Sequence, residues 1–155
     1  MTTSTTPPSL GGDQFYVYGS SNEIIFAALK FIQVVDSALF HHMKTRHNWT
    51  IYDYGTTDNK VDGKTWIDGG WCQAHLNLPA IRQEARKLGL PFIKWLASIL
   101  VHEQQHCDTM DDERPSVLAQ LHFEKRWPAG FDRERAIAAS QDDLTRIGPD
   151  GHWKD

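Results

Sequence analysis

Residues 98–106 of this chain are SILVHEQQH, and the rest of the sequence is organised around them. The stretch contains H-E-x-x-H, which on a helix places two histidines four residues apart on the same face. The imidazoles of His102 and His106 can therefore bind one Zn²⁺ ion together. Glu103, the neighbour of His102, can then act on a water molecule at that ion. These residue types in this order predict a metal centre with hydrolytic chemistry.

An apolar stripe leads directly into this motif. The predicted helix begins at Pro91 and carries, at helical spacing, Phe92, Trp95, Leu96, Ile99 and Leu100. Further steps of three and four residues along the same face reach the histidines and the glutamate of the motif. A zinc ligand has to lie on the buried side of such a helix, and a chance match on a solvated surface would not continue a core stripe. The placement of the motif therefore favours a metal site.

The third metal ligand must come from elsewhere, because catalytic zinc usually has three protein ligands and one open position. The acidic residues that follow the motif closely are Asp108, Asp111, Asp112 and Glu113. Glu113 is preferred, because Val117 and Leu121 follow it at i+4 and i+8 on the inward face of the next predicted helix. The predicted ligand set is therefore His102, His106 and Glu113.

Asp112 is the alternative third ligand. It is in line with Ser116 and Gln120, which form a more polar face, and acidic residues before a first helical turn commonly cap the helix. Glu124, further along the same predicted helix, is a candidate outside this group. The choice between Glu113 and Asp112 stays open at this level.

Upstream of the motif, the sequence predicts a long helix and a small sheet. Ser20 and Glu23 form a capping-box pattern ahead of an apolar-periodic run, which predicts one amphipathic helix over residues 22–44. Aromatic and β-branched residues predict short strands at 15–18, 49–54 and 64–68. Residues 72–78 alternate in polarity, which predicts a half-buried strand with a polar face formed by Gln73, His75 and Asn77.

Helices predominate after that strand. Capping residues and apolar spacing predict them from Pro79 to Leu88, from Pro91 through the motif, from Glu113 to Trp127 and from Asp132 to Ile147. The fold class expected is α+β, with a small mixed or antiparallel sheet packed on the long helix. One domain is predicted over residues 14–147. A disordered arm at 1–13, rich in Thr, Ser and Pro, would precede it, and a loose tail at 148–155 would follow it.

Composition narrows the partners. The 155 residues carry a net charge of −4, which gives no reason to expect nucleic acid or an anionic membrane as a partner. The first residues lack the basic and apolar segments of a secretory signal peptide, so a cytoplasmic location is expected and signal-independent secretion stays open. Cys72 and Cys107 are expected to be buried free thiols, with a disulfide between them as the alternative.

The stretch SILVHEQQH resembles the active-site helix of zincin metallopeptidases. Glu113-Arg114-Pro115-Ser116 is similar to the gluzincin pattern E-x-x-A, with Ser in place of the usual Ala, whereas Asp112 as ligand would give a metzincin-like spacing. The resemblance implies a zincin-like fold in which the active-site helix is followed by the ligand-bearing helix. It also implies a zinc-dependent peptidase that acts on a peptide or protein, with Glu103 as the general base.

The same resemblance implies that residues 72–78 form the edge strand that pairs with the substrate, which would place His75 near the cleft. An oxyanion donor is left unassigned among Tyr52, Tyr54, His75, Arg114, His122 and His152. Two other functions remain open. One is a non-catalytic binding or structural module with a zincin-like site, and the other is a toxin, effector or phage-associated protease with one dedicated target.

Overall fold

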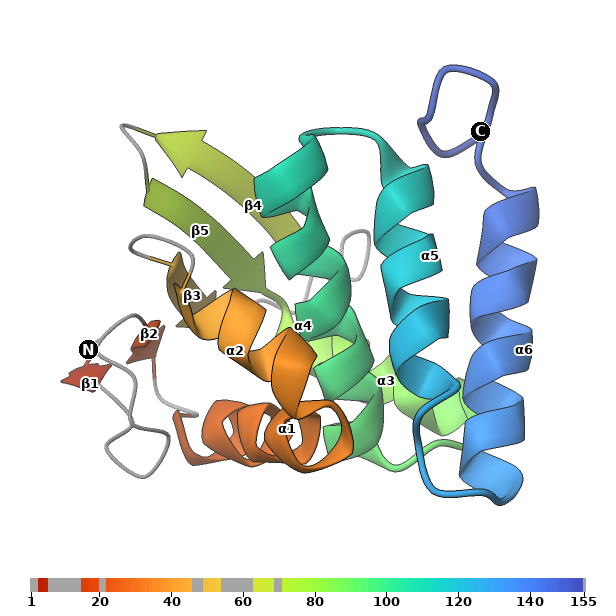
Figure 1. Cartoon of the computed structure of the whole chain (residues 1–155), viewed down its shortest axis with the longest axis horizontal. Helices are drawn as coiled ribbons and strands as arrows, with labels where there is room; N and C mark the ends of the chain where they lie inside the picture. Colours follow the sequence, from red (N-terminus) through yellow and green to blue (C-terminus); the bar gives the residue numbers. More distant parts are fainter. Residues whose placement is uncertain are drawn as a thin grey trace.

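The structure, a computed structural model, describes residues 3–5, 15–19, 22–45, 49–53, 63–68 and 71–154. Within these ranges the chain forms one mixed sheet with helices against it, so the α+β class is confirmed (Figure 1). The strands are β1 (Thr3–Thr5), β2 (Phe15–Gly19), β3 (Trp49–Asp53), β4 (Gly63–Asp68) and β5 (Trp71–Leu76). The helices are α1 (Asn22–Val35), α2 (Ser37–Thr45), α3 (Leu78–Leu88), α4 (Phe92–Thr109), α5 (Glu113–Glu124) and α6 (Phe131–Thr145).

The strand order is β1-β2-β3-β5-β4. Strands β2, β3 and β5 are parallel, whereas β1 is antiparallel to β2 and β4 is antiparallel to β5. Strand β4 therefore forms one edge of the described sheet and β5 lies inside it. In the stretch 1–13, where disorder is expected, Thr3–Thr5 forms strand β1, and the other residues of that stretch lie outside the described ranges.

One face of the sheet packs on the helices. Val17, Ile51 and Ala74 are aligned across β2, β3 and β5, and all three are fully buried. Thr65 on β4 continues this row, since it pairs with Ala74. Neighbouring residues of a strand point to opposite sides, so the next row, with Tyr18, Tyr52 and His75, belongs to the other face.

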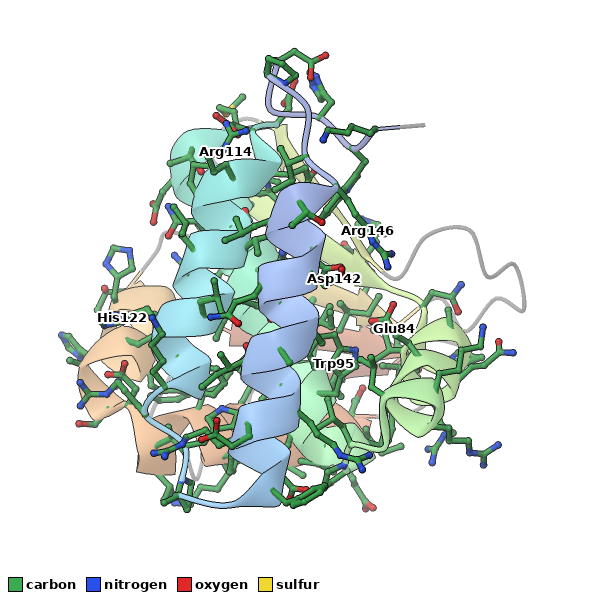
Figure 2. The ribbon with its side chains drawn as sticks, turned by 90° about the vertical axis from the view of Figure 1, so that its right-hand side faces the viewer. Glu84, Trp95, Arg114, His122, Asp142 and Arg146 are labelled. Atoms are coloured by element: carbon green, nitrogen blue, oxygen red, sulfur yellow. A yellow bond between two sulfur atoms is a disulfide. The ribbon has the colours of Figure 1, made fainter. Side chains whose placement is uncertain are left out.

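Helix α4 is the centre of the molecule. It contacts α1, α3, α5, β4 and β5, and in Figure 1 it runs between the sheet and the pair α5 and α6. Every residue from Trp95 to Gln104 is buried, including the motif residues His102 and Glu103. On the α3 side, Trp95 donates its indole N–H to Glu84 at 2.6 Å (Figure 2). The motif therefore lies in the core, as the apolar stripe before it predicts.

The prediction of one long helix over residues 22–44 is wrong. The structure has two helices there, α1 and α2, which meet at Asp36. The carboxylate of Asp36 is almost fully buried and accepts a hydrogen bond from the backbone N–H of Leu39 at 3.1 Å. An Asp that bonds to nearby backbone in this way caps a new helix and favours a change of direction.

The end of the chain is attached to the body, in contrast to the loose tail expected at 148–155. We name residues 147–154 the C-terminal loop. Ile147 pairs with Trp153 in an antiparallel bridge, and the backbone N–H of Glu113 donates to the carbonyl of Gly151 at 2.8 Å. The loop is thereby bound to the first residue of α5.

Cys72 and Cys107 form a disulfide, so the expectation of two free thiols is wrong. The bond joins β5 to α4, and both cysteines are 4% exposed. Disulfides persist mainly in oxidising compartments, which weighs against the expected cytoplasmic location. Among the described helices, none has the length and apolar character that crossing a bilayer would require.

Replacing both cysteines by alanine should lower the free energy of unfolding. The bond spans a sequence separation of 35 residues and restricts the unfolded chain, which predicts a loss of about 4 kcal/mol. Urea denaturation of the wild type and of Cys72→Ala/Cys107→Ala measures it. Wild type under reducing conditions should show the same loss, and equal midpoints with and without reductant would contradict a closed bond.

Candidate metal centre

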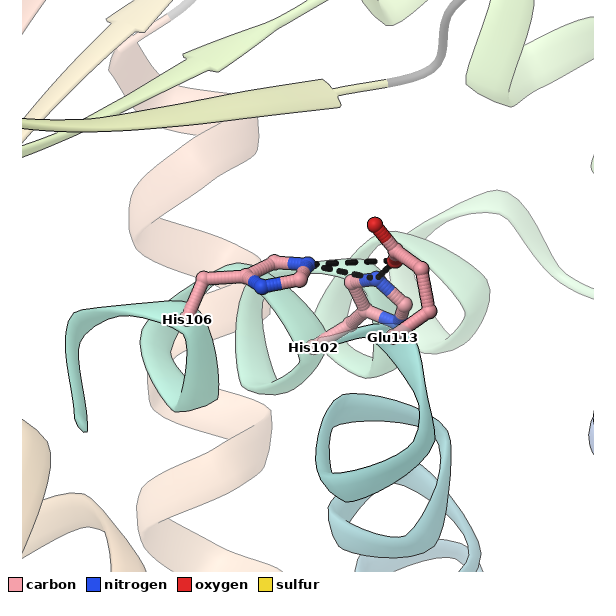
Figure 3. A group of neighbouring side chains, drawn as sticks. All are labelled: His102, His106 and Glu113. Carbon is pink, nitrogen blue, oxygen red and sulfur yellow. Dashed lines mark hydrogen bonds and ion pairs between the residues drawn. The ribbon is translucent and has the colours of Figure 1, made fainter. Parts of the chain in front are cut away.

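Three donor atoms converge between α4 and α5 (Figure 3). The Nε2 atoms of His102 and His106 are 3.2 Å apart, and the Oε1 atom of Glu113 is 3.0 and 3.1 Å from them respectively. Ligand atoms bonded at about 2.0 Å to one tetrahedral zinc ion would be about 3.3 Å apart. The cluster therefore has nearly the spacing that a single metal ion would require.

The preferred third ligand is the acid that the fold brings to the histidines. Glu113 is the first residue of α5, and the turn at Met110 directs that helix back along α4. The alternative, Asp112, is not in the cluster. Its side chain accepts from the backbone N–H of Arg114 at 3.0 Å and caps α5. Asp112 therefore has the capping role that its position before a first turn suggests.

Two further acidic candidates, Asp108 and Glu124, also have other partners. Asp108, in the last turn of α4, interacts with His42 at 3.0 Å and accepts from Gln104 at 3.2 Å. Glu124 is fully buried and accepts from Ser140 at 2.7 Å. Neither carboxylate belongs to the described group of donors that could hold a metal.

The hydrogen bonds at Nδ1 orient both imidazoles. Nδ1 of His102 is 2.7 Å from Oε1 of Gln120, and Nδ1 of His106 is hydrogen-bonded to the carbonyl of Met110. Both partners are acceptors, so each Nδ1 carries the proton and each Nε2 presents a lone pair to the cluster. Two lone pairs and a carboxylate facing one another repel unless a cation lies between them.

In the metal-free protein, protons supply that positive charge. Burial alone would lower the pKa of His106, but the hydrogen bond to Glu113 and the charges of Glu103 and Glu113 raise it to about 9. Burial would raise the pKa of Glu113, but its hydrogen bonds to His102 and His106 lower it to about 2. The field that holds a proton here also favours a divalent cation, which would displace that proton.

Glu103 lies beside this cluster and outside it. The hydroxyl of Thr65 donates to Oε1 of Glu103 at 2.5 Å, and the Glu103 side chain is almost fully buried. Its charge reaches His106, whose pKa it raises. Thr65 belongs to β4 and ends the buried cross-strand row, so the edge strand positions this carboxylate. The role of Thr65 could not be predicted from the sequence, because the alternation of a short strand does not specify its register against a helix.

The expectation that residues 72–78 form the edge strand that pairs with the substrate is wrong. Strand β5 is inside the sheet, and the edge strand next to α4 is β4. His75 lies on the sheet face away from α4, where its ring stacks on Tyr52 with centroids 4.6 Å apart, and burial lowers its pKa. Asn77 caps α3 by accepting from the backbone N–H of Ala80. The polar residues of this strand therefore do not face the metal centre.

The candidate oxyanion donors remain unassigned. Tyr52 stacks with His75 on the far face of the sheet, and Tyr54 lies outside the described residues. Arg114 donates to the carbonyl of Gly148 at 3.1 Å, and His152 interacts with Asp150. His122 is exposed on α5 and points away from the body in Figure 2.

A series of buried, hydrogen-bonded polar side chains supports His102 on its Nδ1 side. Gln120, which binds His102, donates to Ser140 at 3.4 Å, and Ser140 donates to Glu124. Burial raises the pKa of Glu124 to about 8, although the Ser140 hydroxyl opposes that shift. These residues come from α5 and α6, and their i, i+4 spacing on α5 is the sequence signal that could have linked Gln120 with Glu124.

Comparisons of the chain with protein-family models, with curated proteins and with solved structures found no match.

Gln120→Leu should weaken metal binding by about 10- to 100-fold, because it removes the acceptor that sets the tautomer and orientation of His102. Competition with a chromophoric chelator measures the affinity for Zn²⁺, with circular dichroism as the check on folding. Gln141→Leu, the same substitution at an exposed position of α6, is the matched control and should bind like wild type. Equal affinities in all three proteins would contradict this role of Gln120.

Glu124 should make the protein less stable as the pH rises. Its folded pKa of about 8 lies above the ordinary value of 4.5. The folded state therefore holds a proton that the unfolded state releases, and stability is full below about pH 4.5 and lost as the pH rises through about 8. Glu124→Gln is neutral throughout, so at about pH 8 it should be more stable than wild type by on the order of 4 kcal/mol.

Urea denaturation across that pH range measures the effect, and the difference between wild type and Glu124→Gln isolates this carboxyl from other titrating groups. Glu134→Gln, an exposed position on α6, is the control and should follow the wild-type curve. If the Glu124→Gln curve runs parallel to that of wild type, Glu124 does not have a raised pKa.

Proposed function

We propose that the chain is a zinc-dependent peptidase, in which His102, His106 and Glu113 bind the ion and Glu103 is the general base. The observation that carries this proposal is the position of Glu103, a buried carboxylate held by Thr65 beside the donor cluster. Structural zinc sites are closed by four protein ligands, whereas catalytic sites have three and an open position. A cluster of three donors with a separate acid beside it fits the catalytic arrangement.

The donor set also fits zinc. Two neutral imidazole nitrogens and one carboxylate oxygen are borderline ligands that suit zinc better than magnesium or calcium, which prefer oxygen alone. When bound, zinc would supply Lewis-acid activation of a water molecule and polarisation of the scissile carbonyl. The residues of the chain do the rest of the chemistry.

Glu103 would accept the proton of the attacking water and deliver it to the nitrogen of the leaving amine. The Thr65 hydroxyl holds Oε1 of this carboxylate, which leaves the other oxygen for the proton transfer. Strand β4, at the edge of the described sheet, offers backbone N–H and C=O groups to an extended peptide. A peptide paired there would lie next to α4, which β4 contacts.

Glu103→Gln should abolish peptide cleavage and leave zinc bound, because it removes the base and keeps the metal ligands. Loss of a general base lowers the rate by about 100- to 10,000-fold. Metal analysis should find about one zinc per chain in both proteins. Cleavage of a broad peptide library, followed by mass spectrometry, gives the activity.

Glu84→Gln is the matched control. Glu84 is a partly buried carboxylate of α3 that accepts from Trp95, and glutamine retains an acceptor there (Figure 2). This variant should cleave like wild type. Cleavage that persists in Glu103→Gln would remove Glu103 from the base role. Zinc binding by a wild-type protein that cleaves no peptide would favour a binding or structural module.

A further inference from the structure

An exposed tryptophan lies beside the metal centre. The ring of Trp153, in the C-terminal loop, is parallel to the imidazole of His102 within 9°, with ring centroids 6.4 Å apart. Offset stacking of aromatic rings has this separation. Trp153 is 45% exposed, so much of its apolar surface remains open to solvent next to a proposed ligand.

The position of Trp153 is fixed by the backbone of the loop. Its bridge to Ile147, and the hydrogen bonds from Glu113 to Gly151 and from Arg114 to Gly148, bind the loop to the start of α5. In Figure 2, Arg114 lies at the end of α5 below this loop. The helix that supplies the third ligand therefore also supports the tryptophan.

Gly151 allows this close approach. Its φ is +83°, and a Cβ there would lie 2.7 Å from a carboxylate oxygen of Asp112, the cap of α5. Only glycine adopts this conformation without strain and leaves room for the cap. The sequence is thus adapted to seat the loop against α5, and with it the tryptophan beside His102.

A second exposed apolar side chain borders the other histidine. Met110 is 58% exposed, and its carbonyl accepts the hydrogen bond from His106. His102 is therefore stacked with one exposed apolar residue, and His106 is hydrogen-bonded to the backbone of another. Figure 1 shows β4 and the C-terminal loop at the same end of the molecule, with the C-terminal end of α4 and the start of α5 between them.

We propose that Trp153 forms the wall of a specificity subsite, which takes a large apolar or aromatic side chain of the substrate next to the bond that is cut. The inference rests on the proposed peptidase function. A peptide that pairs with β4 and crosses the metal centre would continue toward the loop. The flat, half-exposed indole then offers apolar contact and ring stacking to a side chain next to the scissile bond.

Two hydroxamates test the subsite through binding to the zinc-loaded protein, one with a methyl and one with a benzyl substituent. A hydroxamate chelates zinc, and its substituent then samples the neighbouring surface. Calorimetry gives the two affinities and their ratio in wild type, Trp153→Ala and Trp153→Phe. Wild type should prefer the benzyl compound by about 10-fold or more, since apolar pockets discriminate by about 10- to 200-fold.

The preference should fall to about one in Trp153→Ala and persist in Trp153→Phe, which retains an aromatic wall. Affinity for the methyl compound should be equal in all three proteins and serves as the check that zinc is still bound. Equal wild-type affinities, an unchanged ratio in Trp153→Ala, or no binding of either compound would overturn the subsite. A Trp153-dependent ratio in a protein that cleaves no peptide would retain the subsite and overturn the peptidase.

Discussion

The structure depends on one electrostatic constraint, the convergence of two imidazole nitrogens and a carboxylate oxygen inside the protein. Nε2 of His102, Nε2 of His106 and Oε1 of Glu113 are all within 3.2 Å of one another. The Nδ1 atoms of both histidines already donate to oxygen acceptors, so the Nε2 atoms and the carboxylate oxygen that face inward are all electron-rich. A proton or a metal ion between them relieves this repulsion, and the raised pKa of His106 favours a bound proton when no metal is present. This is why a motif that is costly to bury can sit in the core.

The parts of this centre that follow from local sequence are those on one helix and at the start of the next. His102, Glu103 and His106 share the face of an apolar stripe, and a period of 3.6 residues is enough to predict their burial. Glu113 follows from the same reasoning, because Val117 is buried one turn further along its helix. Helix phase alone does not separate Glu113 from Asp112, because Ser116 is as deeply buried as Val117. What separates the two acids is the capping role of Asp112 at the start of α5.

The parts that could not be predicted depend on contacts between distant segments. Alternating polarity in residues 72–78 predicts a strand with one polar face, but it does not say which face meets a helix or whether the strand lies at an edge. The long helix is divided at Asp36, although apolar periodicity continues across it. The C-terminal loop is held largely through its backbone groups, whose partners the pattern of side chains does not specify. The partner of Thr65 depends on the register of β4 against β5.

The disulfide connects these distant segments to the motif. Cys107 follows His106 on α4, and Cys72 is on β5, two residues before Ala74, the partner of Thr65 on β4. The bond thus fixes the position of β5 along α4. The antiparallel pairing of β4 with β5 then fixes the position of Thr65. Since the Thr65 hydroxyl has to meet Glu103 within hydrogen-bond distance, a slip of one residue would turn Thr65 to the other face of the sheet. The covalent link therefore stabilises the alignment of Glu103 with the strand that positions it, in addition to restricting the unfolded chain.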